Sequence, residues 1–265
     1  MESFLNTLKD RNEPLFYYGA ICLLAAVFCL VLAWRLPVQG ANAWLKPFRF
    51  FASSVLLLWS MAWYMHYLGD NRAVTWYSWG MIALFTFENA YILFQAARGQ
   101  ASHFNVSTPV YAVLYGMMGL AAVGISVWTG YIGVHFFTNP LTDLEPAYRW
   151  GIRLGIVLFV LFSLEGLAMG SRMAHSVGGP DGGEVLPLAG WNRNYGDLRI
   201  AHFFGMHALQ VLPLVSYYLL TSVRASVLAA LLYAVISTWL FVQAMQGKPF
   251  VPVGKKANPV LQKLT

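Results

Sequence analysis

Ionisable side chains inside long apolar stretches are the residues of this sequence best suited to chemistry. Glu88, Glu165, His202 and His207 each lie several residues from the ends of such a stretch. An ionisable group at membrane depth is costly, so each is a candidate for function. Imidazoles and carboxylates bind transition metals, and both can carry protons. The residue types therefore predict metal binding, proton transfer or both.

These groups are predicted to meet near one face of the molecule. At a rise of 1.5 Å per residue, they lie roughly 6–15 Å below the face on which the third and fifth apolar stretches end. His103 and His175 follow those two stretches on the same side. We expect Glu88 and Glu165 to be the catalytic ligands or proton carriers. The six predicted metal ligands are His202, His207, Glu165, Glu88, His175 and His103.

The spacing of the two central histidines limits the kind of metal site. His202 and His207 are five residues apart, which is about 140° around an ideal helix. One metal would bind both only if the helix bulged, so the spacing suits two adjacent metals, or one ligand and one proton carrier. The candidate cofactors are iron, copper or zinc, with His202 and His207 as ligands, or haem b with His103 or His175 as the second axial ligand. The sequence has no Cys-x-x-Cys-His motif for covalent haem.

Composition identifies the elements that must position these residues. Of 265 residues, 58% are hydrophobic and only 11% are charged, against about 25% charged in a typical soluble domain. This excludes a soluble enzyme, a disordered chain, a coiled coil and a nucleic-acid binder. The long continuous apolar runs indicate helices, whereas a barrel would show short alternating segments. We predict an all-α, multi-pass integral membrane protein of the cell or inner membrane.

Seven apolar segments are long enough to cross a bilayer, which takes roughly 20 residues, and we expect one seven-helix domain over 1–265. The predicted spans are about 16–37, 48–68, 74–98, 109–135, 151–173, 198–221 and 225–245. The 174–197 connection is a turn-rich loop over the suspected site, either a lid or a flexible connector. Asp197 is predicted to cap the sixth helix. Pro213 is predicted to kink that helix and to free a carbonyl near Leu209.

Basic residues predict the orientation of these spans. Of the 17 Lys and Arg residues, six fall on the amino-terminal side and eleven on the carboxy-terminal side. Because positive residues gather in the cytoplasm, we predict an outside amino terminus and a cytoplasmic carboxy terminus.

The sequence leaves three functions open. The first is a membrane-embedded protein that binds a non-haem metal or haem b, with redox chemistry on a lipophilic substrate or quinone as one use. The second is a proton- or ion-coupled transporter that uses Glu88, Glu165 and histidines as a relay. The third is a structural membrane protein in which a cofactor-free polar cluster braces the bundle. The bilayer is a partner in all three, and the oligomeric state is left open.

Overall fold

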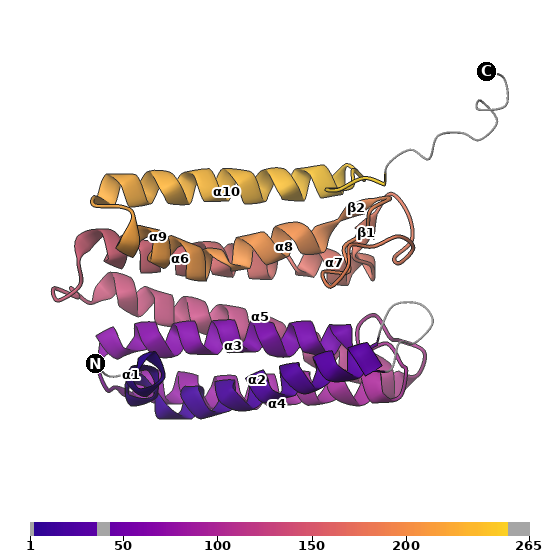
Figure 1. The fold of residues 1–265 in the computed structure, drawn as a ribbon, viewed down its shortest axis with the longest axis horizontal. Helices are drawn as coiled ribbons and strands as arrows, with labels where there is room; N and C mark the ends of the chain where they lie inside the picture. Colours follow the sequence, from indigo (N-terminus) through magenta and orange to yellow (C-terminus); the bar gives the residue numbers. More distant parts are fainter. Residues whose placement is uncertain (1–2, 36–42, 254–265) are drawn as a thin grey trace, which may run out of the picture.

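The computed structural model describes residues 3–35 and 43–253 of the chain. This part is all-α apart from one pair of two-residue strands. Its elements in chain order are α1 (Phe4–Arg11), α2 (Glu13–Arg35), α3 (Leu45–Met65), the short 3₁₀ helix η1 (His66–Leu68), α4 (Arg72–Ala97), α5 (Pro109–Thr138), α6 (Pro146–Leu164), α7 (Leu167–Arg172), β1 (Ser176–Val177), β2 (Gly196–Asp197), α8 (Leu198–Met206), α9 (Ala208–Tyr218) and α10 (Val223–Met245). Figure 1 shows the long helices lying side by side along the longest axis.

The described helices make the chain a multi-pass integral membrane protein. Four helical segments are long and apolar enough to cross a bilayer: Glu13–Arg35, Pro109–Thr138, Pro146–Arg172 and Val223–Met245. The bent pair α8–α9 makes a fifth if it is one span. Large apolar side chains cover the outside of these helices, with Leu24 72% exposed on α2 and Leu120 75% exposed on α5. Such surfaces are stable against lipid rather than water.

The first helix, α1, packs against the end of α3 rather than crossing the bundle. The Arg11 guanidinium lies 3.7 Å from the ring centroid of Trp63 and donates a hydrogen bond to the Trp63 carbonyl at 3.0 Å. Phe4 stacks on the same indole, and Leu8 is fully buried. Cation–π contact and apolar burial therefore hold this polar segment at one end of the bundle.

Glycines allow α6 and α9 to pack closely. Gly151 and Gly155 are four residues apart on one face of α6, and a Cβ atom at either would lie 2.9 Å from a backbone carbonyl oxygen, that of Leu212 or Ala208. Spacing of small residues by four is the usual way in which membrane helices bring their backbones together.

The fifth predicted span is interrupted where α6 gives way to α7. Glu165 and Gly166 form a tight turn in which the Gly166 amide donates to the Ser163 carbonyl, three residues back, at 3.1 Å. In a regular α-helix this amide would bond to the carbonyl of Phe162. The turn therefore leaves the Phe162 carbonyl free for another donor.

The predicted sixth span over 198–221 is two helices rather than one. α8 ends at Met206, α9 begins at Ala208, and the two axes differ by 41° across His207. As predicted, Pro213 frees the Leu209 carbonyl, which accepts a hydrogen bond from the Tyr64 hydroxyl at 2.9 Å. The bend, however, lies six residues before the proline, at the histidine itself.

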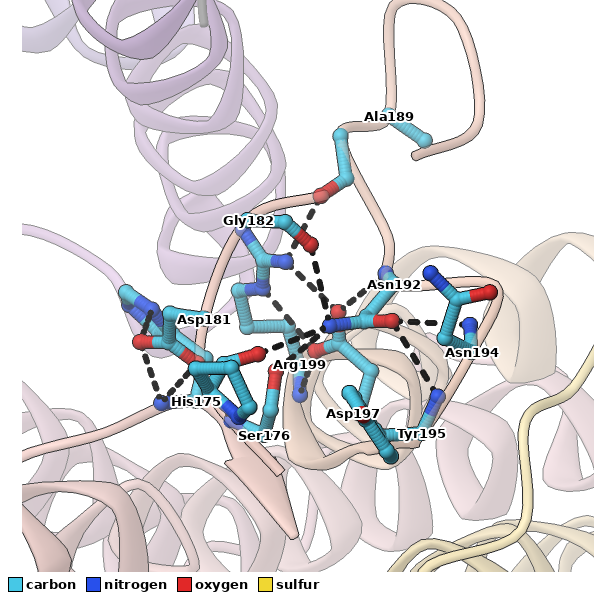
Figure 2. Close-up of polar contacts among 12 residues, drawn as sticks. His175, Ser176, Asp181, Gly182, Ala189, Asn192, Asn194, Tyr195, Asp197 and Arg199 are labelled. Carbon is cyan, nitrogen blue, oxygen red and sulfur yellow. Dashed lines mark hydrogen bonds and ion pairs between the residues drawn. The ribbon is translucent and has the colours of Figure 1, made fainter. Parts of the chain in front are cut away.

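Asn192 and Asp181 hold the connection between α7 and α8 together through hydrogen bonds. β1 and β2 pair antiparallel, with Ser176 opposite Asp197. The Asn192 side chain donates to the Ser176 hydroxyl and to two loop carbonyls, and its oxygen accepts two backbone amides. The Asp181 carboxylate accepts the amides of His175 and Ser176. Figure 2 shows this hydrogen-bond network. As predicted, Asp197 caps α8.

Candidate functional site

A cavity of about 170 Å³ lies between α3, α4, α5, α6 and the α8–α9 pair. Its walls are mostly apolar with a few polar groups, as in small-molecule sites. The lining residues are Phe50, Ser53, Leu56, Leu57, Phe85, Glu88, Ala122, Ile125, Ser126, Phe159, Ser163, His202, Met206, His207 and Gln210. Three of the predicted site residues, Glu88, His202 and His207, therefore share one cavity. On a regular helix His202 and His207 would point in directions about 140° apart. The chain is not a regular helix here, because it bends by 41° at His207.

The His202 imidazole is held in one tautomer by the free carbonyl of Phe162. Its Nδ1 lies 2.8 Å from that oxygen, and a carbonyl can only accept a hydrogen bond. Nδ1 therefore carries the proton, and in the neutral ring Nε2 keeps its lone pair. The turn at Glu165–Gly166 thus determines which nitrogen of His202 is available for chemistry.

His207 is held in the same tautomer through Gln210. The amide nitrogen of Gln210 donates to the Leu56 carbonyl at 3.3 Å and to the Ser60 hydroxyl at 3.1 Å. Its oxygen therefore faces His207, whose Nδ1 lies 3.1 Å away and must donate. The Nε2 of neutral His207 is left as an acceptor.

The remaining polar groups of the cavity add few donors. The Glu88 side chain is 6% exposed, and no hydrogen bond or ion pair to it is found among the described residues. The hydroxyls of Ser126 and Ser163 already donate to carbonyls of their own helices, at 2.8 and 3.0 Å. Besides the Ser53 hydroxyl, which also lines the cavity, the polar atoms available to a ligand are two imidazole nitrogens and a carboxyl group.

Glu165 lies behind His202 instead of lining the cavity. Its Oε2 is 3.4 Å from His202 Nδ1, and neither carboxyl oxygen has a hydrogen-bond donor in the described part of the chain. The Nδ1 proton of His202 points to the Phe162 carbonyl, which is closer than the Glu165 carboxyl group. Glu165 is therefore placed to act on the charge of His202 and cannot contact a cavity ligand directly.

His103 and His175 are not among the lining residues of the cavity; both lie in the loop layer beyond it. The Nδ1 of His175 bonds to Asp181 at 3.0 Å, and its ring lies 4.8 Å from that of Phe104. Burial lowers the pKa of His175 more than the Asp181 hydrogen bond raises it. Burial, with the charge of Lys46, holds the pKa of His103 well below its usual value.

The described residues do not form a compact metal shell. No group of three His, Cys, Asp or Glu side chains in 3–35 and 43–253 is placed to hold one metal ion. The acceptors of the cavity come from α4, from α8 and from the break at His207. Helix spacing predicts Met206 and Gln210 on the same faces as His202 and His207, four and three residues further on, and both line the cavity. Ser163 also lines it, without such a signal in the sequence.

Comparison with protein-family models, with curated proteins and with solved structures finds no match for this chain. The function must therefore be argued from the cavity itself.

The loop gives a pH-dependent prediction through Asp181. Burial acts to raise the pKa of Asp181, but hydrogen bonds from the His175 side chain and backbone and from Ser176 outweigh it, so the pKa lies below its usual value. Since the folded pKa is lower than the unfolded value of about 3.9, this stabilisation exists above about pH 4 and is lost as the pH falls further. Hydrogen exchange across 174–197, corrected for intrinsic rates, should accelerate in that range.

Asp181→Asn is the matched variant for this prediction. It should exchange faster than wild type at pH 7 and lack the acid step below about pH 4. The low pKa of His175 adds a separate, earlier loss below about pH 6.5 in both proteins. Identical profiles of the two proteins below pH 4 would show that Asp181 does not hold the loop.

Proposed function

We propose that this protein binds a small lipid-soluble molecule through hydroxyl groups that donate hydrogen bonds, such as a quinol. The observation that carries the proposal is the set of unoccupied acceptors in one cavity: the Nε2 atoms of His202 and His207 and the Glu88 carboxyl group. These atoms line the cavity rather than being buried against protein, so a ligand in the cavity can reach them. A ligand that donates hydrogen bonds suits these acceptors.

The shape of the cavity supports a ring-sized head group. Its volume of about 170 Å³ is below the roughly 300–1,000 Å³ of sites for drug-sized ligands, so a single substituted ring suits it better than a macrocycle. Phe50, Phe85 and Phe159 supply flat apolar surface. Acceptors from α4, from α8 and from the break at His207 suit a molecule with separated hydroxyls.

Glu165 would support proton uptake from such a ligand. A hydroxyl that donates to His202 Nε2 can pass its proton to that nitrogen, which leaves the ligand oxygen negative and the imidazole positive. The Glu165 carboxylate, 3.4 Å from Nδ1, would stabilise that positive charge electrostatically. Glu165 is on this account a positioning and charge-stabilising residue, and His202 is the group that contacts the ligand.

The test compares a short-chain benzoquinol with its dimethyl ether, which has the same ring but no donors. Two hydrogen bonds of about 1 kcal/mol each predict that the quinol binds about 30-fold more tightly to the detergent-purified protein. His207→Phe should remove roughly half of this difference on a logarithmic scale. Equal affinities for quinol and ether would contradict the proposal.

A transition metal is a second candidate because of the bonds behind the two histidines. Metal-ligating histidines usually donate their other ring nitrogen to a carbonyl or carboxylate, as His202 and His207 do to Phe162 and Gln210. Iron, copper or zinc would then bind Nε2 of one of these histidines, because no three His, Cys, Asp or Glu side chains in 3–35 and 43–253 are placed to hold one ion together. Elemental analysis of the purified protein tests this: stoichiometric metal, lost in His202→Phe, favours the metal over the quinol. We propose no haem, since the cavity is too small for the macrocycle.

We also propose that α3 and α4 cross the membrane, which gives seven spans with the amino terminus outside. They contain 21 and 26 residues, or about 32 and 39 Å of helix, enough for a core of about 30 Å. Their lower apolar content is consistent with polar side chains that face the interior, such as Ser54 and Asn89, which bond to each other at 3.0 Å. Labelling of single cysteines at Asp70 and Gly99 from opposite sides of the membrane tests this.

A further inference from the structure

Two arginines meet at one turn of the loop between β1 and β2. Arg49 of α3 donates from Nη1 to the Ala189 carbonyl at 3.0 Å, and Arg199 of α8 donates from Nη2 to the Gly190 carbonyl at 2.6 Å. Because these carbonyls belong to consecutive residues, the guanidinium groups are neighbours. Gly190 has φ +69°, and a Cβ atom there would lie 2.7 Å from Arg49 Nη1. A larger residue at position 190 would therefore clash with the Arg49 guanidinium group.

Lys46 brings a third basic side chain close to Arg49 and Arg199. It precedes Arg49 by three residues on α3, so the two share one face of the helix. Burial, and after it the charges of Arg199 and Arg49, lowers the pKa of the Lys46 ammonium group to about 7. No hydrogen bond or ion pair to this ammonium group is found among residues 3–35 and 43–253. We call Lys46, Arg49 and Arg199 the cation cluster.

The carboxylates near the cation cluster do not balance it. Asp197 is fully buried and accepts from both Nε and Nη2 of Arg199. Asp181 is engaged by His175 and Ser176. A fully charged cation cluster less these two carboxylates leaves a charge of +1, with the donors of Lys46 unused among the described residues. Figure 2 shows Arg199 and Asp197 at the centre of this network.

Two histidines, His103 and His175, lie near the cation cluster. After burial, the charge of Lys46 is the next largest factor that lowers the pKa of His103. The charges of Arg199 and Lys46 likewise lower the pKa of His175. Uncharged imidazoles therefore border the cation cluster, and they add no negative charge to it.

We infer that the cation cluster binds a phosphate group, with Lys46 and Arg49 as its principal contacts. Lysine supplies a point charge and arginine a fork of donors, the combination that phosphate oxygens favour. The site lies where α3 and α8 begin, beside the loop and at the end of the bundle. That is the level of lipid head groups, so an anionic phospholipid or free phosphate could supply the group. This inference is independent of the cavity ligand.

The test uses purified full-length protein in neutral detergent, with short-chain phosphatidylglycerol and inorganic phosphate as separate probes at constant ionic strength. At least one probe should bind, and Lys46→Met should weaken that binding roughly tenfold or more, since it removes a charge-assisted contact. Lys46→Arg should retain most of the affinity. Lys9→Met is the control, because Lys9 lies on α1, outside the cluster.

Each outcome decides the inference. If phosphate displaces bound phosphatidylglycerol, the cation cluster is a general phosphate site. If it does not, the cluster is specific for the lipid head group. Either result supports the inference. Binding of neither probe, or equal binding to wild type and Lys46→Met, overturns it. If Lys46→Met cannot be purified, the wild-type protein alone still tests the inference, because failure to bind either probe overturns it. Quinol binding by the same variant shows whether the cavity is intact, which separates this result from the proposed function.

Discussion

Replacing His202 with Leu should destabilise the protein by about 2–4 kcal/mol, because a buried polar group that loses its neighbouring donor costs about 1–3 kcal/mol and two such groups are affected. Two groups lose their partner at once. The Phe162 carbonyl, freed by the turn at Glu165–Gly166, loses its 2.8 Å donor. The Glu165 carboxyl group, whose oxygens have no hydrogen-bond donor in the described chain, loses the imidazole 3.4 Å away. Reversible unfolding in mixed detergent measures the loss.

A double variant separates this explanation from a simple packing defect. With Glu165→Leu added to His202→Leu, no carboxyl group is left unpaired, and only the Phe162 carbonyl lacks a donor, at about 1–3 kcal/mol. The double variant should therefore be more stable than His202→Leu alone. His135→Leu is the control, since His135 contacts the Tyr131 ring at the other end of α5, and should stay near wild type. A double variant less stable than both single variants would contradict the account.

Gly205→Ala should be strongly destabilising. An added Cβ would lie 2.0 Å from Cγ and 2.2 Å from Cβ of Phe162. These atoms sit next to the backbone, so α6 or α8 must move as a whole. Overpacking of this kind costs typically 1–3 kcal/mol, and we expect the upper end, about 3 kcal/mol. Because the Phe162 carbonyl orients His202, quinol binding should fall as well.

Gly116→Ala is the matched control for this substitution. Both glycines lie in helices, but a Cβ at Gly116 meets nothing within 4 Å. There the better helix propensity of alanine predicts a gain of up to about 1 kcal/mol. The two variants should thus shift thermal stability in opposite directions. Equal shifts would show that the α6–α8 contact at Phe162 is not as close as described.

Much of this fold could be predicted from local sequence, because a segment that crosses a bilayer must be long, apolar and helical. Long apolar runs predicted the helices, Asp197 predicted a cap, and Pro213 predicted a free Leu209 carbonyl. The approach of Glu88, His202 and His207 followed from helix length and direction alone. Each of these features depends on residues near one another in the chain or on a common bilayer thickness.

The features that sequence reasoning missed depend on contacts between distant segments. The break at His207 is not at Pro213, and the turn at Glu165–Gly166 carries no proline; at these breaks α6 and α8 pack against each other through Gly205 and Phe162. The predicted places of His103 and His175 in the metal shell assumed that loop residues fold down onto the helices. Asp181 instead holds His175 in the loop, and periodicity gives no signal for such a pairing.

The most direct test of the account is an experimental structure of the protein with a benzoquinol bound. We predict the ring in the cavity between α3, α4, α5, α6 and α8–α9, with hydroxyl oxygens about 2.7–3.0 Å from Nε2 of His202 and of His207. Nδ1 of each ring should keep its present partner, Phe162 or Gln210. A quinol bound elsewhere, or one in the cavity whose hydroxyls avoid both imidazoles, would contradict the central claim.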